Sequence, residues 1–345
     1  MPKMPKIINS EDACYMKMCL QLASRGCGDV SPNPMVGAML VKGGRVIGQG
    51  YHRKAGLAHA EIDAFKSCRR SCRGATLYVN LEPCSHFGRT PPCVDEVIKR
   101  GVKRVVIAMR DPNPLVRGRS IKKMKQAGIK VEIGAGAKGA GRLNEVFIKN
   151  MRSNMPFVAA KWAQSLDGKL VSCKGRSKWI TGKPARRFAK SLRDKYDAVL
   201  VGVNTAIIDD PRLDGLRKIP FKIVLDSQGR LPRQSKLARK YADRLIVVKG
   251  KRSRIDLKQM LKKLYQMGIM SVFVEGGAQT LGGFFDAGLV DKVYCFIAPK
   301  ILGSQAALSA VGGKGFASPE HCPIIKNLEV LPIGPDLLLT GYPQV

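Results

Sequence analysis

Short apolar runs alternate with longer amphipathic segments along the whole chain. Continuous apolar runs bounded by polar or glycine residues predict buried strands, and apolar positions spaced three or four apart predict helices. In the first half of the chain, we predict strands at residues 36–41, 75–79 and 104–108, and helices at residues 13–24, 60–68 and 93–100.

The same alternation resumes in the second half. Here we predict strands at residues 157–162, 198–203, 222–225, 245–248 and 271–274, and a helix over residues 184–195 that has proline in its first turn. Strands that alternate with helices are typical of α/β proteins. We therefore expect mainly parallel α/β sheets in both halves.

The length of 345 residues favours two domains. The segment MRSNMPFVAAKWAQSLDGK follows the last helical residues of the first half, and Met155-Pro156 precedes a new apolar run. We place the boundary near residue 152, which predicts domains over residues 1–152 and 153–345.

The composition restricts the class of protein. The sequence contains no run of about 18 apolar residues, which a membrane-spanning helix would need. The N-terminus has no apolar signal core. The ten cysteines are then expected to be reduced thiols or metal ligands in the cytoplasm. The formal net charge of +34 is spread over both halves, so we expect no specific nucleic-acid recognition and no membrane partner.

One cluster of motifs carries metal chemistry. His59 and Glu61 open a predicted helix, and Cys84 and Cys93 follow. Three nitrogen or thiolate ligands plus one open position are typical of catalytic zinc, which lowers the pKa of its bound water to about 7. Glu61 is then the proton shuttle of a zinc deaminase, although the eight residues between the cysteines are more than the two of the common motif.

The segments SPNPMVGAMLV (31–41), GYHRKAGLAHAE (50–61) and NLEPCSHFGRTPPC (80–93) resemble the bifunctional riboflavin-biosynthesis deaminase/reductase family, in which the longer cysteine spacing is normal. The resemblance implies a cytidine-deaminase-like fold and a pyrimidine and ribose-phosphate pocket lined by Asn33, His52 and the loop around His86 and Arg89. From the residues alone, His52 and His86 could equally be structural histidines.

The second half contains the run VEGGAQTLGG (274–283), a predicted strand entering a glycine turn and a helix. Such a turn can bind phosphate, although alone it is a weak signal. Together with MPFVAAKWAQSLDGK, SKWITGKPARR, LVGVNTAIIDDPRL and IVLDSQGRLP, it resembles the reductase half of the same family, which is similar in fold to dihydrofolate reductase. This implies hydride transfer from NADPH that converts a ribosyl group to ribityl.

The resemblance assigns residues by motif. It implies that the cofactor is bound by Ala163, Trp179, Thr205, Asp209, Ser227, Gly277, Ala278, Gln279, Thr280, Leu281, Gly282 and Gly283. It implies that the phosphorylated pyrimidine is bound by Ser177, Arg193, Leu213, Glu275 and, less cleanly aligned, Arg217. Without the resemblance, a solvated helix-face charge is the simpler interpretation of Arg193.

Two rival functions remain open at this point. One is a zinc-dependent nucleic-acid deaminase, which the cysteine spacing and the reductase-like second half disfavour. The other is a basic nucleic-acid-binding protein with a structural zinc, for which Glu61 would have no purpose. We expect a small-molecule enzyme that forms a homo-oligomer.

Overall fold

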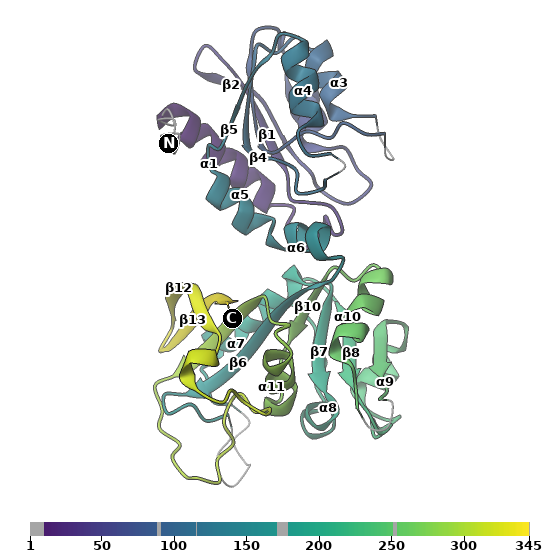
Figure 1. Cartoon of the computed structure of the whole chain (residues 1–345), viewed down its shortest axis with the longest axis vertical. Helices are drawn as coiled ribbons and strands as arrows, with labels where there is room; N and C mark the ends of the chain where they lie inside the picture. Colours follow the sequence, from purple (N-terminus) through teal and green to yellow (C-terminus); the bar gives the residue numbers. More distant parts are fainter. Residues whose placement is uncertain (1–9, 88–90, 115, 171–178, 251–253, 345) are drawn as a thin grey trace. The chain divides into compact units, whose positions relative to one another are not determined.

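The computed structural model describes residues 10–87, 91–114, 116–170, 179–250 and 254–344. The chain divides into two compact units, Met1–Ser153 and Asn154–Val345. Each unit contains its own sheet with helices on both faces (Figure 1).

The sheet of the first unit has the strand order β2-β1-β3-β4-β5. Its strands are β1 (Gly37–Lys42), β2 (Arg45–Tyr51), β3 (Thr76–Leu81), β4 (Arg104–Met109) and β5 (Lys130–Ile133). β3, β4 and β5 are parallel, whereas β1 is antiparallel to both β2 and β3. This sheet is therefore mixed, and the expectation of a mainly parallel sheet was wrong for this half.

The mixed sheet has a local cause. β1 and β2 are joined by Gly43 and Gly44, whose φ angles are 58° and 71°. Two consecutive left-handed residues form the tight turn that matches the twist of an antiparallel hairpin, and glycine adopts this conformation without steric cost. The pair Gly43-Gly44 was a hairpin signal that the prediction of isolated strands did not use.

Helices cover both faces of this sheet. Helices α2 (Ala60–Ser67), α3 (Cys93–Lys99) and α4 (Arg119–Gln126) contribute Phe65, Val97 and Met124 to one core cluster. Helices α1 (Ser10–Ser24) and α5 (Ala137–Leu143) contribute Met16 and Ala140 to the cluster on the opposite face. Helix α6 (Glu145–Ser153) ends the unit. The predicted helices at 13–24, 60–68 and 93–100 are confirmed.

The second unit is built on a sheet with the order β12-β13-β11-β6-β10-β7-β8-β9. Its strands are β6 (Phe157–Ser165), β7 (Ala198–Gly202), β8 (Phe221–Leu225), β9 (Leu245–Val248), β10 (Ser271–Val274), β11 (Lys292–Ala298), β12 (Ile324–Ile333) and β13 (Asp336–Gln344). The strands from β11 to β9 are parallel, and β13 and β12 are antiparallel additions. The five predicted strands are confirmed, and β11 to β13 were not predicted.

The helices of this unit are α7 (Lys183–Leu192), α8 (Val203–Asp209), α9 (Lys236–Lys240), α10 (Leu257–Gln266) and α11 (Ala278–Asp286), with single 3₁₀ turns at Arg193–Lys195, Ala242–Arg244 and Pro319–His321. α10 and α11 place Leu261 and Phe284 in the core over one sheet face. Phe188 of α7 packs against Phe296 on the other face. Among the described helices, none has the length and apolar character needed to cross a membrane.

Candidate active sites

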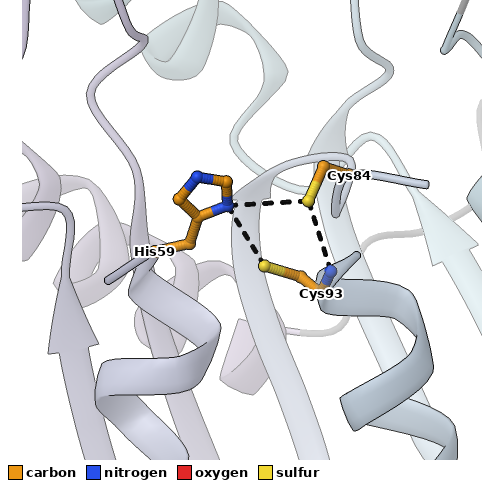
Figure 2. Close-up of side chains that lie close together, drawn as sticks. All are labelled: His59, Cys84 and Cys93. Carbon is orange, nitrogen blue, oxygen red and sulfur yellow. Dashed lines mark hydrogen bonds between the residues drawn. The ribbon is translucent and has the colours of Figure 1, made fainter. Parts of the chain in front are cut away.

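Three side chains with metal-ligating atoms meet in the first unit (Figure 2). His59 immediately precedes α2, Cys93 is the first residue of α3, and Cys84 follows β3. His59 Nδ1 lies 3.2 Å from Cys93 Sγ and 3.5 Å from Cys84 Sγ. All three potential ligand atoms lie within 4.8 Å of one another, so one ion can contact all of them. One nitrogen and two sulfurs are the donor set that zinc prefers.

The geometry explains how the cysteines meet across eight intervening residues. The Cys93 backbone N–H donates to Cys84 Sγ at 3.2 Å, and the Val94 N–H donates to the Cys84 carbonyl at 3.2 Å. The start of α3 is thereby held against the end of the loop that follows β3. Hydrogen bonds from Cys93 and His59 lower the pKa of the Cys84 thiol, which favours the thiolate that a metal requires.

Glu61 lies in the first turn of α2 and is only 3% exposed. Burial raises its carboxyl pKa to about 7, and the neighbouring Cys84 thiolate adds to the shift. A carboxyl group with a pKa near neutrality can both accept and donate a proton at physiological pH. Glu61 therefore has the protonation behaviour of a general acid–base group beside the three ligands.

A cavity of about 440 Å³ opens at this cluster and is lined by Glu61, Asn33, His52 and His86 among others. Asn33 Nδ2 lies 3.1 Å from His52 Nε2, and His52 Nδ1 lies 3.1 Å from the Ala58 carbonyl. If Nδ1 donates to that carbonyl, Nε2 accepts from Asn33, which requires a neutral imidazole. Burial lowers the pKa of His52 and supports this form. The predicted Arg89 lies outside the described residues.

Sequence reasoning missed three polar residues of this cavity: Glu82, Asp111 and Asn113. The Glu82 carboxylate accepts hydrogen bonds from the Gly118 N–H at 2.9 Å and from Ser120 Oγ at 2.7 Å. Burial raises the pKa of Asp111 to about 6. Glu82 and Asp111 follow two neighbouring parallel strands, β3 and β4, so their shared position at one sheet edge was a usable signal.

In the second unit, the predicted cofactor residues follow adjacent parallel strands. Thr205 lies in α8 after β7, and Gly277 and Thr280 lie at the start of α11 after β10. The Gly202 N–H donates to the Gly276 carbonyl at 3.0 Å. A Cβ atom on Gly277 would lie 3.3 Å from Thr205 Oγ1, and one on Gly202 would lie 2.6 Å from Thr280 Oγ1. A side chain at either position would crowd a threonine hydroxyl, so glycine lets these two turns pack closely against Thr205 and Thr280.

The remaining predicted cofactor residues differ in their surroundings. Leu281 is 1% exposed and belongs to the apolar core, and a Cβ on Gly282 would lie 2.1 Å from the Gly312 carbonyl oxygen. Packing alone therefore accounts for a leucine at position 281 and a glycine at position 282. Trp179 is 57% exposed, with the Arg186 guanidinium 4.5 Å from its ring centroid. Ala163 lies on β6, Ser227 follows β8, Asp209 ends α8, and Ala278, Gln279 and Gly283 lie on α11.

A partly buried charge cluster lies beside the paired strands β6 and β10. Arg193 donates through Nε and Nη2 to both carboxylate oxygens of Glu275, and its Nη1 donates to the Asp214 carbonyl at 2.9 Å. Lys161 Nζ, on β6, lies 3.8 Å from Glu275 Oε2. Burial alone would raise the pKa of Glu275, but Arg193 and Lys161 outweigh it and hold the pKa below its ordinary value. Lys161 was not predicted, although a lysine within the apolar run FVAAKWA is an evident anomaly.

The other predicted substrate residues differ in how far they are exposed to solvent. Leu213 is 3% exposed and has a left-handed φ of 56°. The Arg217 side chain is 68% exposed, with its Nε 4.0 Å from Asp194 Oδ2. Ser177 lies outside the described residues. The structure therefore brings Arg193 and Glu275 into direct contact and leaves the side chain of Arg217 largely in solvent.

Comparisons with known proteins identify a family for each half of the chain. Residues 9–109 match the family described as cytidine and deoxycytidylate deaminase zinc-binding region, and residues 156–339 match the RibD C-terminal domain. The riboflavin biosynthesis protein RibD of Aquifex aeolicus is 42% identical over 96% of this chain and 99% of that relative. RibD of Escherichia coli is 38% identical over 95% and 98%, respectively.

Two solved structures extend the similarity. RibD of Acinetobacter baumannii aligns with a TM-score of 0.89 at 37% identity, covering 97% of this chain and 99% of that one. A deaminase/reductase from Thermotoga maritima, titled diaminohydroxyphosphoribosylaminopyrimidine deaminase/5-amino-6-(5-phosphoribosylamino)uracil reductase, aligns with a TM-score of 0.86 at 36% identity and the same coverage.

The fold and the sites define a two-domain enzyme that joins a zinc-type deaminase to a reductase. The chain belongs to the RibD family, and it is a bifunctional enzyme of riboflavin biosynthesis. The predicted family, the cytidine-deaminase-like and reductase domains, and both enzyme classes are confirmed. The comparisons do not favour either nucleic-acid alternative.

Proposed function

We propose that the first unit hydrolytically deaminates 2,5-diamino-6-(5-phosphoribosylamino)pyrimidin-4(3H)-one and that the second unit reduces the ribosyl group of the product to ribityl with NADPH. The observation that carries the first half is the convergence of His59, Cys84 and Cys93 beside the buried Glu61. The observation that carries the second is the row of cofactor-type residues next to the Arg193–Glu275 pair.

The deaminase ligands suit zinc because their donors are one imidazole nitrogen and two thiols. Bound there, zinc acts as a Lewis acid and lowers the pKa of water. Glu61 receives a proton and delivers it to the leaving ammonia, a role supported by its burial and its pKa of about 7.

Recognition of the pyrimidine falls to the polar lining of the same cavity. Asn33 and the neutral His52 form a fixed pair, so the remaining donor and acceptor atoms of the Asn33 amide have a set orientation. Asp111 and Asn113 add acceptors and donors on another side of the cavity. A planar heterocycle with several amino and carbonyl groups needs such a fixed pattern, because each unpaired polar group in a closed site costs binding energy.

In the reductase, the glycine turn between β10 and α11 supports a bound phosphate-bearing cofactor, because backbone N–H groups at such a turn and helix start can bind phosphate. NADPH supplies the hydride when it is bound. Ala163 and Trp179 are proposed to flank its nicotinamide end, and Ser227 its adenosine end. Arg193 and Lys161 bind the sugar phosphate, for which a partly buried guanidinium and ammonium provide positive charge, and Glu275 holds the two cations in place.

The proposal includes self-association of the chain. β12 is an edge strand of the described sheet, yet Ile324, Leu328 and Val330 on it are 59%, 53% and 53% exposed. Exposed apolar edge strands favour pairing with another chain. A second copy of this chain would bury this strand. Sedimentation of wild type and Val330→Lys tests this, and a monomeric wild type would contradict it.

The function is tested by turnover of the diaminopyrimidine ribosyl phosphate by the zinc-loaded chain, with ammonia release and NADPH oxidation followed separately. Ammonia should appear without NADPH, and NADPH should be consumed only after deamination. A single-stranded oligonucleotide containing cytosine serves as the rival substrate and should release no ammonia. Deamination of the oligonucleotide but not of the small pyrimidine would reject the proposal.

A further inference from the structure

The turn after β8 is held by one buried carboxylate. Asp226 is 1% exposed, and its two oxygens accept the N–H groups of Arg230 at 2.9 Å and Leu231 at 2.8 Å. The Asp226 N–H in turn donates to the Val248 carbonyl of β9 at 2.9 Å. Gly229 occupies the left-handed position of the turn with a φ of 72°. The turn that carries Ser227 and Arg230 is therefore fixed to the sheet at its base.

The Arg230 side chain links this turn to α8. Its Nη2 donates to Asn204 Oδ1 at 2.8 Å, and Asn204 immediately precedes Thr205 in the first turn of that helix. The strands before both segments, β7 and β8, are parallel neighbours. Arg230 thus links the turn that carries Ser227 to the helix that carries Thr205, and both of these residues are proposed to bind the cofactor. The bond to Asn204 engages one N–H of a guanidinium that has several.

The order of the strands gives the cofactor a direction. The substrate-type cluster of Lys161 and Glu275 lies at β6 and β10, the glycine turn follows β10, and Thr205 and Ser227 follow β7 and β8. Hydride transfer requires the nicotinamide to lie at the substrate. The adenosine half must then extend along the sheet edge toward the turn that follows β8.

We propose that Arg230 binds the 2′-phosphate on the adenosine ribose and so selects NADPH over NADH. This rests on the proposed nicotinamide cofactor and adds a residue that determines which form of it is used. A guanidinium presents two parallel N–H groups to a phosphate dianion, which a hydroxyl does not match in charge. An arginine near the cofactor ribose is a general means of accepting this phosphate in dinucleotide enzymes.

The fixed turn strengthens the interaction. Because Asp226 holds the backbone of Arg230 and Asn204 holds its side chain, little conformational freedom is lost when phosphate binds. Asn204→Ala should therefore weaken NADPH binding less than the loss of Arg230 does, since only the orientation of the guanidinium is released.

The test measures dissociation constants for NADPH and NADH by fluorescence titration of the full chain, in the absence of pyrimidine substrate. Arg230→Ala should weaken NADPH binding about 10- to 100-fold and change NADH binding less than about threefold. Arg230→Lys should fall between wild type and alanine, because it keeps the charge but loses the paired geometry. Arg233→Ala is the matched control, since Arg233 is an exposed arginine of the same loop, and it should leave both constants unchanged.

The possible results distinguish failure of the proposed role of Arg230 from failure of the cofactor proposal. Equal losses for NADPH and NADH in Arg230→Ala, or unchanged binding of both, would overturn the role of Arg230 while the cofactor proposal stands. Absence of NADPH binding by wild type, with intact deaminase activity showing that the chain is folded, would overturn the cofactor proposal itself. Near-native circular dichroism of Arg230→Ala excludes unfolding as the cause of a selective effect.

Discussion

Arg193 donates hydrogen bonds to both carboxylate oxygens of Glu275, although the two residues lie 82 positions apart in the chain. Arg193 begins the 3₁₀ turn after α7, and Glu275 immediately follows β10. The two side chains are mostly shielded from solvent, with exposures of 20% and 8%. Breaking such a pair leaves an uncompensated charge in a medium of low polarity. The contact therefore makes the two proposed substrate residues a single unit.

Removal of the guanidinium should impair reduction alone. In Arg193→Ala, the reductase loses a proposed phosphate partner and Glu275 loses its counter-ion, so we expect kcat/KM for reduction to fall about 10- to 100-fold. Deamination should be unchanged because its cavity is lined by residues of the other unit. Steady-state assays of each step with its own substrate measure this.

Arg187→Ala provides the control for Arg193→Ala, because Arg187 is an exposed arginine on the same α7 helix. This variant should keep both activities. If Arg193→Ala reduced with wild-type kcat/KM, the cluster would be a structural ion pair rather than a substrate site.

Loss of either cysteine ligand should remove the metal. We expect about one zinc per chain in the wild type, and far less in Cys84→Ser and Cys93→Ser, because a hydroxyl is a poor replacement for thiolate. Elemental analysis of the purified chains measures zinc. Cys68→Ser is the control, since the described metal-type cluster contains only His59, Cys84 and Cys93. Unchanged zinc in both ligand variants would refute the assignment.

Replacement of Glu61 should impair deamination alone, the reverse of the effect expected for Arg193→Ala. Glu61→Gln keeps the shape of the side chain but cannot accept a proton, so deamination should fall by about 10² to 10⁴. Reduction of the already deaminated substrate should continue at its normal rate. Simultaneous loss of both activities in a folded, zinc-loaded chain would argue against two independent sites.

Asp111 should make stability depend on pH. Burial raises its pKa from 3.8 to about 6, so the folded state binds more protons than the unfolded state between these values. The free energy of unfolding contributed by this group therefore falls as pH rises through that window and stays low above it. Asp111→Asn removes the penalty and should raise the free energy of unfolding by about 1–3 kcal/mol near pH 8.

The same substitution should have little effect near pH 4, where Asp111 is protonated in the folded chain. In the wild type, the Asn113 nitrogen lies 2.8 Å from Asp111 Oδ1. The side-chain amide oxygen of the Asp111→Asn variant can still accept this N–H. Urea unfolding of both proteins at the two pH values gives the comparison. A stabilisation equal at both pH values would show that the carboxylate charge is not its cause.

Local sequence signals were sufficient for much of the fold. Continuous apolar runs predicted β7 and β10, whose residues are buried on both faces of a parallel sheet. The strand β12 was missed because its apolar residues are largely exposed, so the pattern follows no buried face. β2 was missed for a similar reason, since several of its seven residues lie in solvent.

The candidate sites divide in the same way. His59, Glu61, Cys84 and Cys93 form a motif with its own chemistry, and they could be identified before any fold was known. Lys161 is anomalous in its apolar run, but its partner could not be inferred, because Glu275 is brought beside it only by the pairing of β6 with β10. Gly282 illustrates the reverse problem, since a glycine in a phosphate-type motif is also required for close approach of the Gly312 backbone.

The division of the chain between Ser153 and Asn154 has a consequence for the path of the intermediate. All the residues that line the deaminase cavity precede this point, and Lys161, Arg193 and Glu275 all follow it. Each proposed binding site thus uses residues of one unit only, so the deaminated compound is bound by different residues in the two steps. During a reaction with limiting NADPH it should accumulate in solution, where a separately added reductase could capture it. Because one chain carries both units, the deaminase and the reductase are always present in equal numbers. This holds even though each unit catalyses a separate chemical step.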